Sequence, residues 1–443
     1  MQSRRDHVQA YQFATGRLAS SLASGDPGTG EAPMRRSGLG AMFGVLVTVL
    51  LVGVFAVYGL LKPVQTNTWA HNGALIVEKE TGNRYLYTGG QLHPTANYAS
   101  ALLVVGSNAA VQQVARAALA DVPRGAPLGI PGAPDDVPRP SALLTGAWAD
   151  CLRPGKAVGE ALDFAPATVH RVPDGTRVLV SGPDGTRYVV WNGKKYRVGA
   201  RSSLIALGLD TEQPVRATPA WLDGLPSGTT IAPARVPGAG GAGRTVAGTR
   251  AKVGRLFRTV VSGVSHHYVL RTDGVAPITA TESALLATEP GEQQPAQVSP
   301  GDIAAVQASS DSTLLHRVPD LLNASGSTAD GGAALCLLHS AHGAHTSVVR
   351  ETGRAAAPGA RVLVPPGHAV LAVPPRNPAE PNMPDPYLIT DRGVKYVLAG
   401  QAVAALGYDG RAARTLPPAV LHQIPTGVKL TRSQARAAVR EAK

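Results

Sequence analysis

One sequence pattern occurs twice in this chain, and it limits the fold more than any other feature. The stretch YVVWNGKKYRVGARSSLIALGL at 188–209 returns as YLITDRGVKYVLAGQAVAALGY at 387–408. The match continues downstream, where PAWLDGLPSG at 219–228 corresponds to PAVLHQIPTG at 418–427. Repeats of this size predict small structural units that pack together, because each is too small to bury a core alone.

The pattern predicts a β-hairpin followed by a short helix. One strand is expected to begin at Tyr188, and a second strand is expected to include Tyr196. Asn192 and Gly193 between them suit a two-residue hairpin turn, because both turn positions need positive φ. Gly208 then ends a short helical stretch. The corresponding residues of the second copy are Tyr387, Gly393 and Tyr396, with one more residue in the turn.

Two looser copies of the pattern are also present. The stretch YLYTGGQLHPTANYASALLVVG begins at Tyr85 and includes Gly90 in its turn. The stretch YVLRTDGVAPITATESALL begins at Tyr268 and includes Gly274. Both contain a proline near the place where the other two copies have a tyrosine. The sequence therefore predicts four ββα units of two alternating kinds.

The alternation indicates duplication of a larger block. Tyr85 and Tyr268, the two cysteines, and the tetrapeptide RVLV at 177–180 and 361–364 are separated by nearly the same number of residues. We expect two halves, roughly 70–232 and 253–432, that contribute strands to one shared sheet across a pseudo-twofold axis. The two cysteine segments and both RVLV segments would build this core.

These observations set the expected domain limits. The high content of Gly (50) and Pro (36) is typical of many short elements joined by turns. The Gly-rich stretch PGAGGAGRTVAG reads as a linker, and the proline-rich stretch VPPRNPAEPNMPDP as an extended loop. The limits are 1–36 (N-terminal segment), 37–61 (membrane helix), 70–128 (unit one), 141–187 (core segment one), 188–232 (unit two), 233–252 (linker), 253–310 (unit three), 311–386 (core segment two with the proline-rich loop), 387–430 (unit four) and 431–443 (basic tail).

Residues 37–61 contain no charged side chain and predict a membrane helix. As a helix the run is about 37 Å long, enough to cross a hydrocarbon core of about 30 Å. A buried core helix or a cleaved signal peptide are the alternatives. A core helix is rarely so long and apolar, and the stretch after the run offers no small-x-small cleavage site.

The charges that flank this helix predict its orientation. Arg35 and Arg36 precede the run and Lys62 follows it, and the arginines concentrate on the N-terminal side. The positive-inside rule places residues 1–36 in the cytoplasm and the larger C-terminal part outside. Residues 1–36 include a helical pattern, which predicts either an amphipathic helix on the membrane surface or a docking helix for a cytoplasmic partner.

The two cysteines, Cys151 and Cys336, occupy equivalent positions in the two halves. Both lie outside the membrane, where disulfides persist. We predict that they form a disulfide across the pseudo-twofold axis. Two buried free thiols are the alternative.

The charge balance argues against a nucleic-acid partner. The formal net charge is +12, and most of it lies beyond the membrane helix, where nucleic acid is scarce. Anionic lipid or a cell-wall polymer would also attract this charge, and a solvated surface is the simpler interpretation.

No stretch of the sequence predicts a catalytic, cofactor or metal site. GAGGAGRT at 238–245 resembles a phosphate-binding loop, but neither a strand before it nor a helix after it is evident. His339, His342 and His345 follow Cys336 at spacings that suit an exposed loop better than a zinc site. SHH at 265–267 has no acidic partner nearby, and the G-x-S-x-G and H-E-x-x-H motifs are absent.

Taken together, these features resemble a known family. A short N-terminal segment with QAYQF and GDP, one membrane helix, YLYTGGQLHPTANYASALLVVG directly beyond it, the cysteine pair and YVVWNGKKYRV are similar to EccB. EccB is the single-pass membrane component of the actinobacterial type VII (ESX) secretion system. The resemblance implies an α+β fold: one N-terminal transmembrane helix, then an elongated extracytoplasmic domain with four repeat units around a central β-sheet core that carries a disulfide.

The family resemblance also implies partners and cargo. EccB proteins assemble with EccC, an FtsK/SpoIIIE-type ATPase, with EccD and in many systems with EccE, and WXG-type helical-hairpin proteins pass through the complex. ATP hydrolysis has been proposed for the family, but no residue of this sequence supports it. We therefore predict a non-enzymatic channel component without cofactors that self-associates outside the membrane. A membrane-anchored wall-binding module, or a membrane-anchored ATPase or hydrolase, are the alternatives.

Overall fold

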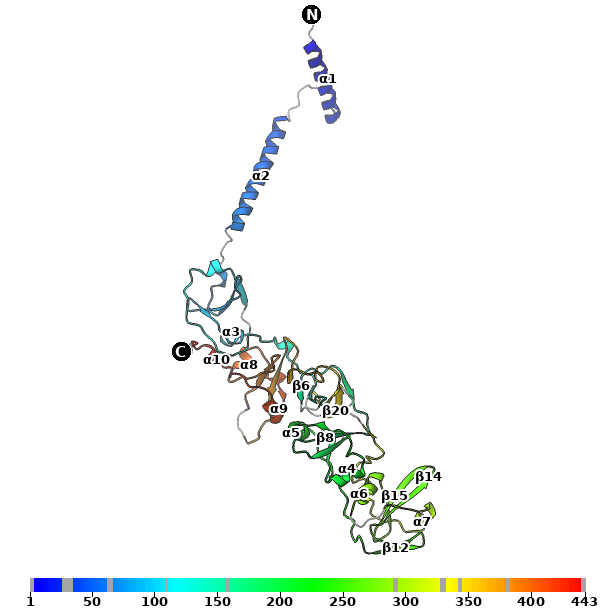
Figure 1. The fold of residues 1–443 in the computed structure, drawn as a ribbon. Helices are drawn as coiled ribbons and strands as arrows, with labels where there is room; N and C mark the ends of the chain where they lie inside the picture. The colour runs from blue at the N-terminus through cyan, green and yellow to red at the C-terminus, as the bar shows by residue number, and fades with distance from the viewer. Residues whose placement is uncertain are drawn as a thin grey trace. The chain divides into compact units, whose positions relative to one another are not determined.

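The computed structural model describes residues 4–25, 35–61, 67–107, 110–155, 159–289, 294–326, 332–341, 345–379 and 383–439. The chain divides into two units, Met1–Trp69 and Ala70–Lys443 (Figure 1). Each unit is described by itself.

The first unit consists of helices. Helix α1 spans Arg4–Ser24 and α2 spans Arg35–Leu61, and a short 3-10 helix follows at Asn67–Trp69. Within α2, Gly38–Gly59 has a mean hydropathy of 2.5, and none of it is buried against other residues. A helix satisfies all of its backbone hydrogen bonds internally, so an apolar helix of this length suits a bilayer. Arg35 and Arg36 begin α2, whereas Lys62 lies outside the described residues.

The second unit contains four small sheets with the same strand order, here called modules one to four. In each, the third strand pairs with the second, the second with the first, and the first with the fourth, which follows a helix. The elements of module one are β1 (Ala74–Glu78), β2 (Arg84–Thr88), β3 (Gln91–Pro94), α3 (Tyr98–Val105) and β4 (Val111–Val114). Those of module two are β8 (Thr176–Ser181), β9 (Arg187–Trp191), β10 (Lys194–Arg197), α4 (Arg201–Ala206), β11 (Val215–Arg216) and α5 (Pro219–Asp223), with β18 (Ser325–Gly326) added beside β8.

The other two modules follow the same order. The elements of module three are β14 (Leu256–Val261), β15 (Val264–Leu270), β16 (Val275–Ile278), α6 (Ala280–Leu286), β17 (Ala296–Gln297) and α7 (Pro300–Ala304). Those of module four are β22 (Ala369–Val373), β23 (Tyr387–Thr390), β24 (Lys395–Val397), α8 (Ala402–Ala405), β25 (Arg414–Thr415) and α9 (Pro418–Gln423). The remaining helices are α10 (Arg432–Ala435) and 3-10 turns at Arg116–Leu119, Pro140–Ala142, Thr313–Leu315 and Gly410–Ala412.

The second and third strands of each module form a tight hairpin. Tyr188 faces Arg197 across β9 and β10, and the turn residues Asn192 and Gly193 have φ values of 44° and 74°. These left-handed values explain the Asn-Gly pair, because few other residues adopt them without strain. Gly274, at the corresponding turn of module three, is required for space instead: a Cβ there would lie 2.1 Å from the Gln307 carbonyl oxygen.

A loop after each module helix binds the third strand through the same two backbone hydrogen bonds. One residue of the third strand donates its amide to the loop, and its carbonyl accepts an amide two residues further along that loop. The four pairs are Leu92 N to Pro123 O with Gly125 N to Leu92 O, Lys195 N to Pro226 O with Gly228 N to Lys195 O, Val275 N to Gln307 O with Ser309 N to Val275 O, and Lys395 N to Pro425 O with Gly427 N to Lys395 O.

A six-stranded sheet lies between the modules and receives strands from both halves of the chain. Its order is β21-β6-β5-β19-β20-β7. The first half provides β5 (Trp148–Leu152), β6 (Glu160–Asp163) and β7 (Val169–Arg171). The second half provides β19 (Ala334–His339), β20 (Thr346–Glu351) and β21 (Val362–Leu363). The centre of the sheet is therefore an antiparallel pair, β5 and β19, that joins the two halves.

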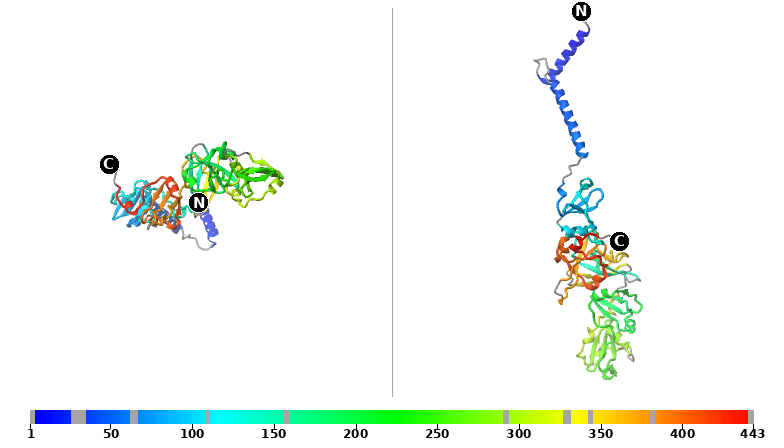
Figure 2. Two further views of the ribbon diagram at one scale, coloured as in Figure 1. Left: turned by 90° about the horizontal axis from the view of Figure 1, so that it is seen from below. Right: turned by 90° about the vertical axis from the view of Figure 1, so that its left-hand side faces the viewer.

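The modules pack in two pairs, which Figures 1 and 2 show side by side. Helix α3 of module one packs on α8 and α10, and Leu103 shares a core with Leu388 of module four. Helix α4 of module two packs on α6 of module three, where Leu207 and Leu285 share another core. The central sheet packs on module four through Trp148 and Phe164, and on module two through residues such as Leu337.

The structure corrects several of the expected limits. The predicted ββα unit lacks the first and fourth strands of each module. The first strands of modules two and four, β8 and β22, lie within the predicted core segments, and the fourth strands are too short to show periodicity. The two RVLV segments are not equivalent: the first lies in β8 of module two, the second around β21 of the central sheet. The connection between β20 and β21 is longer than that between β6 and β7, so the first strand of module four, β22, begins beyond the second segment.

Two segments expected to lack structure are ordered. The predicted linker 233–252 contains a hairpin, β12 (Ala242–Val246) and β13 (Thr249–Lys252), whose Val246 is buried against module three. The predicted basic tail contains α10, where Ala435 is buried and Arg432 donates hydrogen bonds to the carbonyls of Leu103 and Val104. In both segments a few apolar residues contact a neighbouring module, which local composition does not reveal.

Candidate functional sites at the central sheet and the module joint

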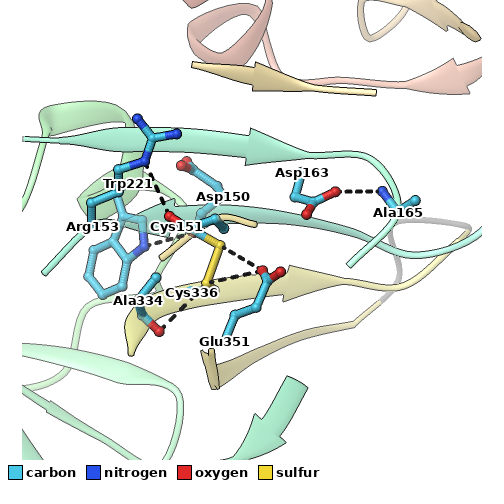
Figure 3. The surroundings of a disulfide bond; sticks show 10 residues. Asp150, Cys151, Arg153, Asp163, Ala165, Trp221, Ala334, Cys336 and Glu351 are labelled. Carbon is cyan, nitrogen blue, oxygen red and sulfur yellow. Dashed lines mark hydrogen bonds between the residues drawn. A yellow bond between two sulfur atoms is a disulfide. The ribbon is translucent and has the colours of Figure 1, made fainter. Parts of the chain in front are cut away.

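Cys151 and Cys336 form a disulfide at the centre of the six-stranded sheet (Figure 3). The two cysteines are direct partners in the register of β5 and β19, and both are fully buried. Their positions are 185 residues apart in the sequence. The bond therefore joins the two halves at the point where their strands meet.

Glu351 lies against this disulfide. It is the last residue of β20 and is 1% exposed. Its Oε2 atom is 3.5 Å from Cys151 Sγ and 3.9 Å from Cys336 Sγ. Disulfide sulfurs carry no proton, so a hydrogen bond here requires a protonated carboxyl as the donor. Burial, reinforced by the nearby carboxylate of Asp163, raises the pKa of Glu351 to about 7, which favours this protonated form.

Other buried carboxylates line the same sheet. Asp163 is fully buried and accepts a hydrogen bond from Arg354, with 2.7 Å between Oδ1 and Nη2. Glu160 pairs with Arg361 at 3.0 Å. Burial, followed by the charge of Glu160, raises the pKa of Asp150 well above its usual range. Both arginines come from the connection between β20 and β21, so the second half supplies cations to acids of the first half.

The histidine segment has a packing role at its first residue. The ring of His339 stacks on Trp148 with centroids 4.1 Å apart, and burial lowers its pKa to about 4. His342 lies outside the described residues. Among the described residues, the cysteines and Glu351 are the group of potential metal ligands close enough to share an ion, and the disulfide occupies both sulfurs.

The glycine-rich stretch 238–245 does not have the geometry of a phosphate-binding loop. It leads into the hairpin of β12 and β13 rather than into a helix. The amides of Ala239, Gly240 and Gly241 donate to the carbonyls of Val236, Val253 and Gly238 respectively. These amides are therefore not free to surround a phosphate group, which is the basis of phosphate-loop binding.

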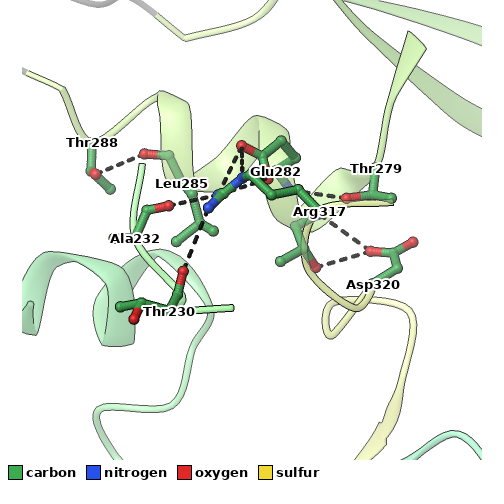
Figure 4. A network of polar contacts seen from close by, with 9 residues as sticks. Thr230, Ala232, Thr279, Glu282, Leu285, Thr288, Arg317 and Asp320 are labelled. Atoms are coloured by element: carbon green, nitrogen blue, oxygen red, sulfur yellow. Dashed lines mark hydrogen bonds and ion pairs between the residues drawn. The ribbon is translucent and has the colours of Figure 1, made fainter. Parts of the chain in front are cut away.

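Arg317 joins modules two and three (Figure 4). Its Nη2 atom is 2.8 Å from Oε2 of Glu282, which is fully buried in α6. The same guanidinium donates to the carbonyls of Ala232, at 2.6 Å, and Thr230, at 3.5 Å, in the chain leaving module two. Asp320 accepts hydrogen bonds from the Thr281 amide and hydroxyl. One loop thus holds both modules through charged side chains.

Sequence reasoning did not find this joint. Arg317 lies in the unremarkable stretch LLHRVPD, and Glu282 follows a helix cap formed by Thr279, as many surface glutamates do. In the fold, Glu282 is fully buried where α4 packs on α6, and it pairs with Arg317. Burial raises the pKa of Glu282 even though Arg317 opposes this shift.

The described residues thus use their buried charges to fix modules and halves to each other. This arrangement defines a class of protein: a multi-module protein joined by buried ion pairs, in a chain with one described helix suited to a membrane.

The family is identified by comparison. Residues 1–441 match the family model described as "Type VII secretion system ESX-1, transport TM domain B", the EccB family, and the chain belongs to this family. The chain is 26% identical to the ESX-3 secretion system ATPase EccB3 of Mycolicibacterium smegmatis, over 97% of this chain and 90% of the relative. It is 29% identical to the ESX-5 secretion system ATPase EccB5 of Mycobacterium marinum, over 68% of this chain and 62% of that relative, so the match spans less than two thirds of the ESX-5 protein.

Solved structures share the fold. A chain of the periplasmic assembly from the ESX-5 inner membrane complex matches with a TM-score of 0.64 and 22% identity, covering 86% of this chain and 99% of that one. A chain of the EccB3 dimer from the ESX-3 core complex matches with a TM-score of 0.57 and 23% identity, covering 82% and 100%. The predicted family and a mixed α and β fold with one N-terminal apolar helix are confirmed. With α2, family membership makes the chain a single-pass membrane protein.

Replacing Arg317 by Ala should destabilise the joint strongly. The variant leaves the Glu282 carboxylate buried without its cation, which typically costs about 3–5 kcal/mol. Urea unfolding of the full chain in detergent, followed by tryptophan fluorescence, measures this loss. Arg411→Ala is the matched control, because Arg411 is exposed and forms no ion pair with a described residue; it should change the free energy by less than about 0.5 kcal/mol. Equal effects of the two variants would contradict the role of Arg317.

Glu351 should make the stability depend on pH. Its folded pKa of about 7 lies above the ordinary value of 4.5, so the folded state binds the proton more tightly. Stability from this group is fully present below about pH 4.5 and is lost as the pH rises through 7. Glu351→Gln should therefore lose less stability than the wild type between pH 5 and pH 8, in urea unfolding at both pH values. The exposed Glu289→Gln should behave as wild type, and an unchanged pH dependence in Glu351→Gln would refute the assignment.

Proposed function

We propose that this chain is a structural component of the type VII (ESX) secretion machinery, which supports assembly of the membrane complex and export of WXG-type proteins. The observation that carries the proposal is the use of buried charges. Asp163, Glu160 and Glu282 each pair with an arginine from another part of the chain. Groups of this kind hold a scaffold in one shape, whereas a catalytic site needs polar groups that converge on an open cavity.

We infer that the four modules are repeat units that arose by duplication of a two-unit block. The common strand order and the four equivalent pairs of backbone hydrogen bonds support this origin. The order of the central sheet is also symmetric about the β5–β19 pair, with β6 corresponding to β20. The symmetry breaks at the edges, where β21 is parallel to β6 but β7 is antiparallel to β20.

The membrane anchor sets the sides on which the two units act. The arginines at and before the start of α2 place this side in the cytoplasm by the positive-inside rule, and the modules then lie on the extracytoplasmic side. Helix α1 then presents Val8, Tyr11 and Leu18 in the cytoplasm, all exposed. We propose that α1 docks on an EccC-type or EccD-type subunit.

The extracytoplasmic modules are proposed to associate with further copies of the chain and with EccE-type subunits where these are present. The similar folds come from an ESX-5 inner membrane complex and an EccB3 dimer, which supports assembly for this chain. The proposed arrangement would frame the outer end of the channel.

We propose a non-enzymatic role for this chain, although the similar mycobacterial proteins are named ATPases. The stretch most like a phosphate loop leads into a hairpin, and its amides at 239–241 are already bonded within the protein. This geometry favours a structural role over nucleotide hydrolysis.

Purification of the full chain, tagged at its C-terminus, from membranes of actively secreting cells tests the proposal. Extraction in mild detergent should yield an assembly on the megadalton scale that contains an FtsK/SpoIIIE-type ATPase, identified by mass spectrometry. Deletion of residues 4–24 should release the ATPase but leave the chain in the membrane, because α2 remains. Reproducible recovery of a lone monomer or dimer would overturn the proposal.

A further inference from the structure

We propose that a basic cleft in module three binds an anionic polymer, one that carries phosphate or carboxylate groups at intervals along its length. This inference is independent of the scaffold role. It rests on the shape of the cleft, on its charge, and on the backbone geometry of the segment that lines it.

The cleft has a volume of about 1100 Å³ and lies between the β12–β13 hairpin and the body of module three. Its apolar wall includes Val246, Phe257 and Leu286, all buried in the core clusters of the module. The wall is therefore fixed by the packing of the module, and the cleft is preformed. A cleft of this size accommodates a ligand considerably larger than one phosphate ion.

Four cations line this cleft against one carboxylate. The cations are Arg235, Arg250, Lys252 and Arg255, and the acid is Glu289. None of the four forms an ion pair with a residue that the structure describes. Arg235, Arg250 and Lys252 are exposed, and Arg255 is half-buried. Unpaired charges of one sign in a cleft with apolar walls concentrate the field and attract anions.

The spacing of the cations favours several anionic groups over one. Arg250 and Lys252 are two residues apart on β13, so they share one face of the strand at a separation of about 7 Å. The amides of Gly240 and Gly241 are bonded to Val253 and Gly238, so no backbone cradle for a single phosphate forms there. A chain with repeated charges can contact these cations one after another along the cleft.

Binding of defined anions to the full chain in detergent tests this site. The probes are polyphosphate and poly-glutamate, which separate phosphate from carboxylate recognition, together with inorganic phosphate, ATP and neutral dextran. We expect at least one of the two polyanions to bind, with affinity falling as salt rises, and dextran, phosphate and ATP to bind at least about tenfold more weakly. Calorimetry at low and physiological salt measures each affinity.

Two double variants locate the site. Arg250→Gln with Lys252→Gln, and separately Arg235→Gln with Arg255→Gln, should each weaken polyanion binding by about tenfold or more. The matched control is Arg201→Gln with Arg216→Gln in module two, where both arginines are exposed and outside the cleft; it should change binding less than twofold. Thermal unfolding identifies a variant that fails to fold, and the other pair then carries the test.

The outcomes separate this site from the proposed function. If polyanion binding weakens equally in the control and in the cleft variants, or if neither polyanion binds, the proposed binding site is overturned. ATP binding as tight as polyanion binding, and lost in the same variants, replaces it with a nucleotide site. Co-purification of the secretion complex with the cleft variants should be unchanged, so a failure of one proposal does not imply failure of the other.

Discussion

The antiparallel pairing of β5 with β19 is the interaction on which the rest of the second unit depends. It brings residues far apart in the chain into direct register, and the disulfide between Cys151 and Cys336 makes the pairing covalent. For a loop of 185 residues the chain-entropy model assigns a stabilisation of up to about 5 kcal/mol. With the bond at its centre, the sheet gives each half a fixed surface on which to place its modules.

The module pairs follow from that placement. Module four packs on the side of the sheet that contains Trp148, and module two packs on residues such as Leu337, and each then carries a partner module on its short helices. Apolar contacts between four-residue and eight-residue helices are small, so ion pairs and side-chain bonds to carbonyls supplement them. Arg317 forms such bonds between modules two and three, and Arg432 forms them between modules one and four.

The sequence predicted those features whose cause is local or repeated. Asn192 and Gly193 specify a hairpin by their own backbone preferences, and repetition of the pattern reveals the other hairpins. The family resemblance and the membrane helix at 37–61 could also be predicted from the sequence. The short strand β11 and the hairpin within 233–252 were missed because tertiary contacts, not periodicity, hold them. The joint at Arg317 and the cleft at Arg250 could not be read from the sequence, since both depend on which charges the packing brings together.

The central claim is that the two halves form one cooperative scaffold through the β5–β19 pair. Hydrogen–deuterium exchange of the full chain in detergent, read by mass spectrometry across increasing urea, tests this claim most directly. We predict that peptides from 148–152 and 334–339 exchange together, at the highest urea concentration of any segment in the second unit, and that both lose protection in one transition. Exchange of one central strand well before the other, with its own half opening independently, would contradict the account.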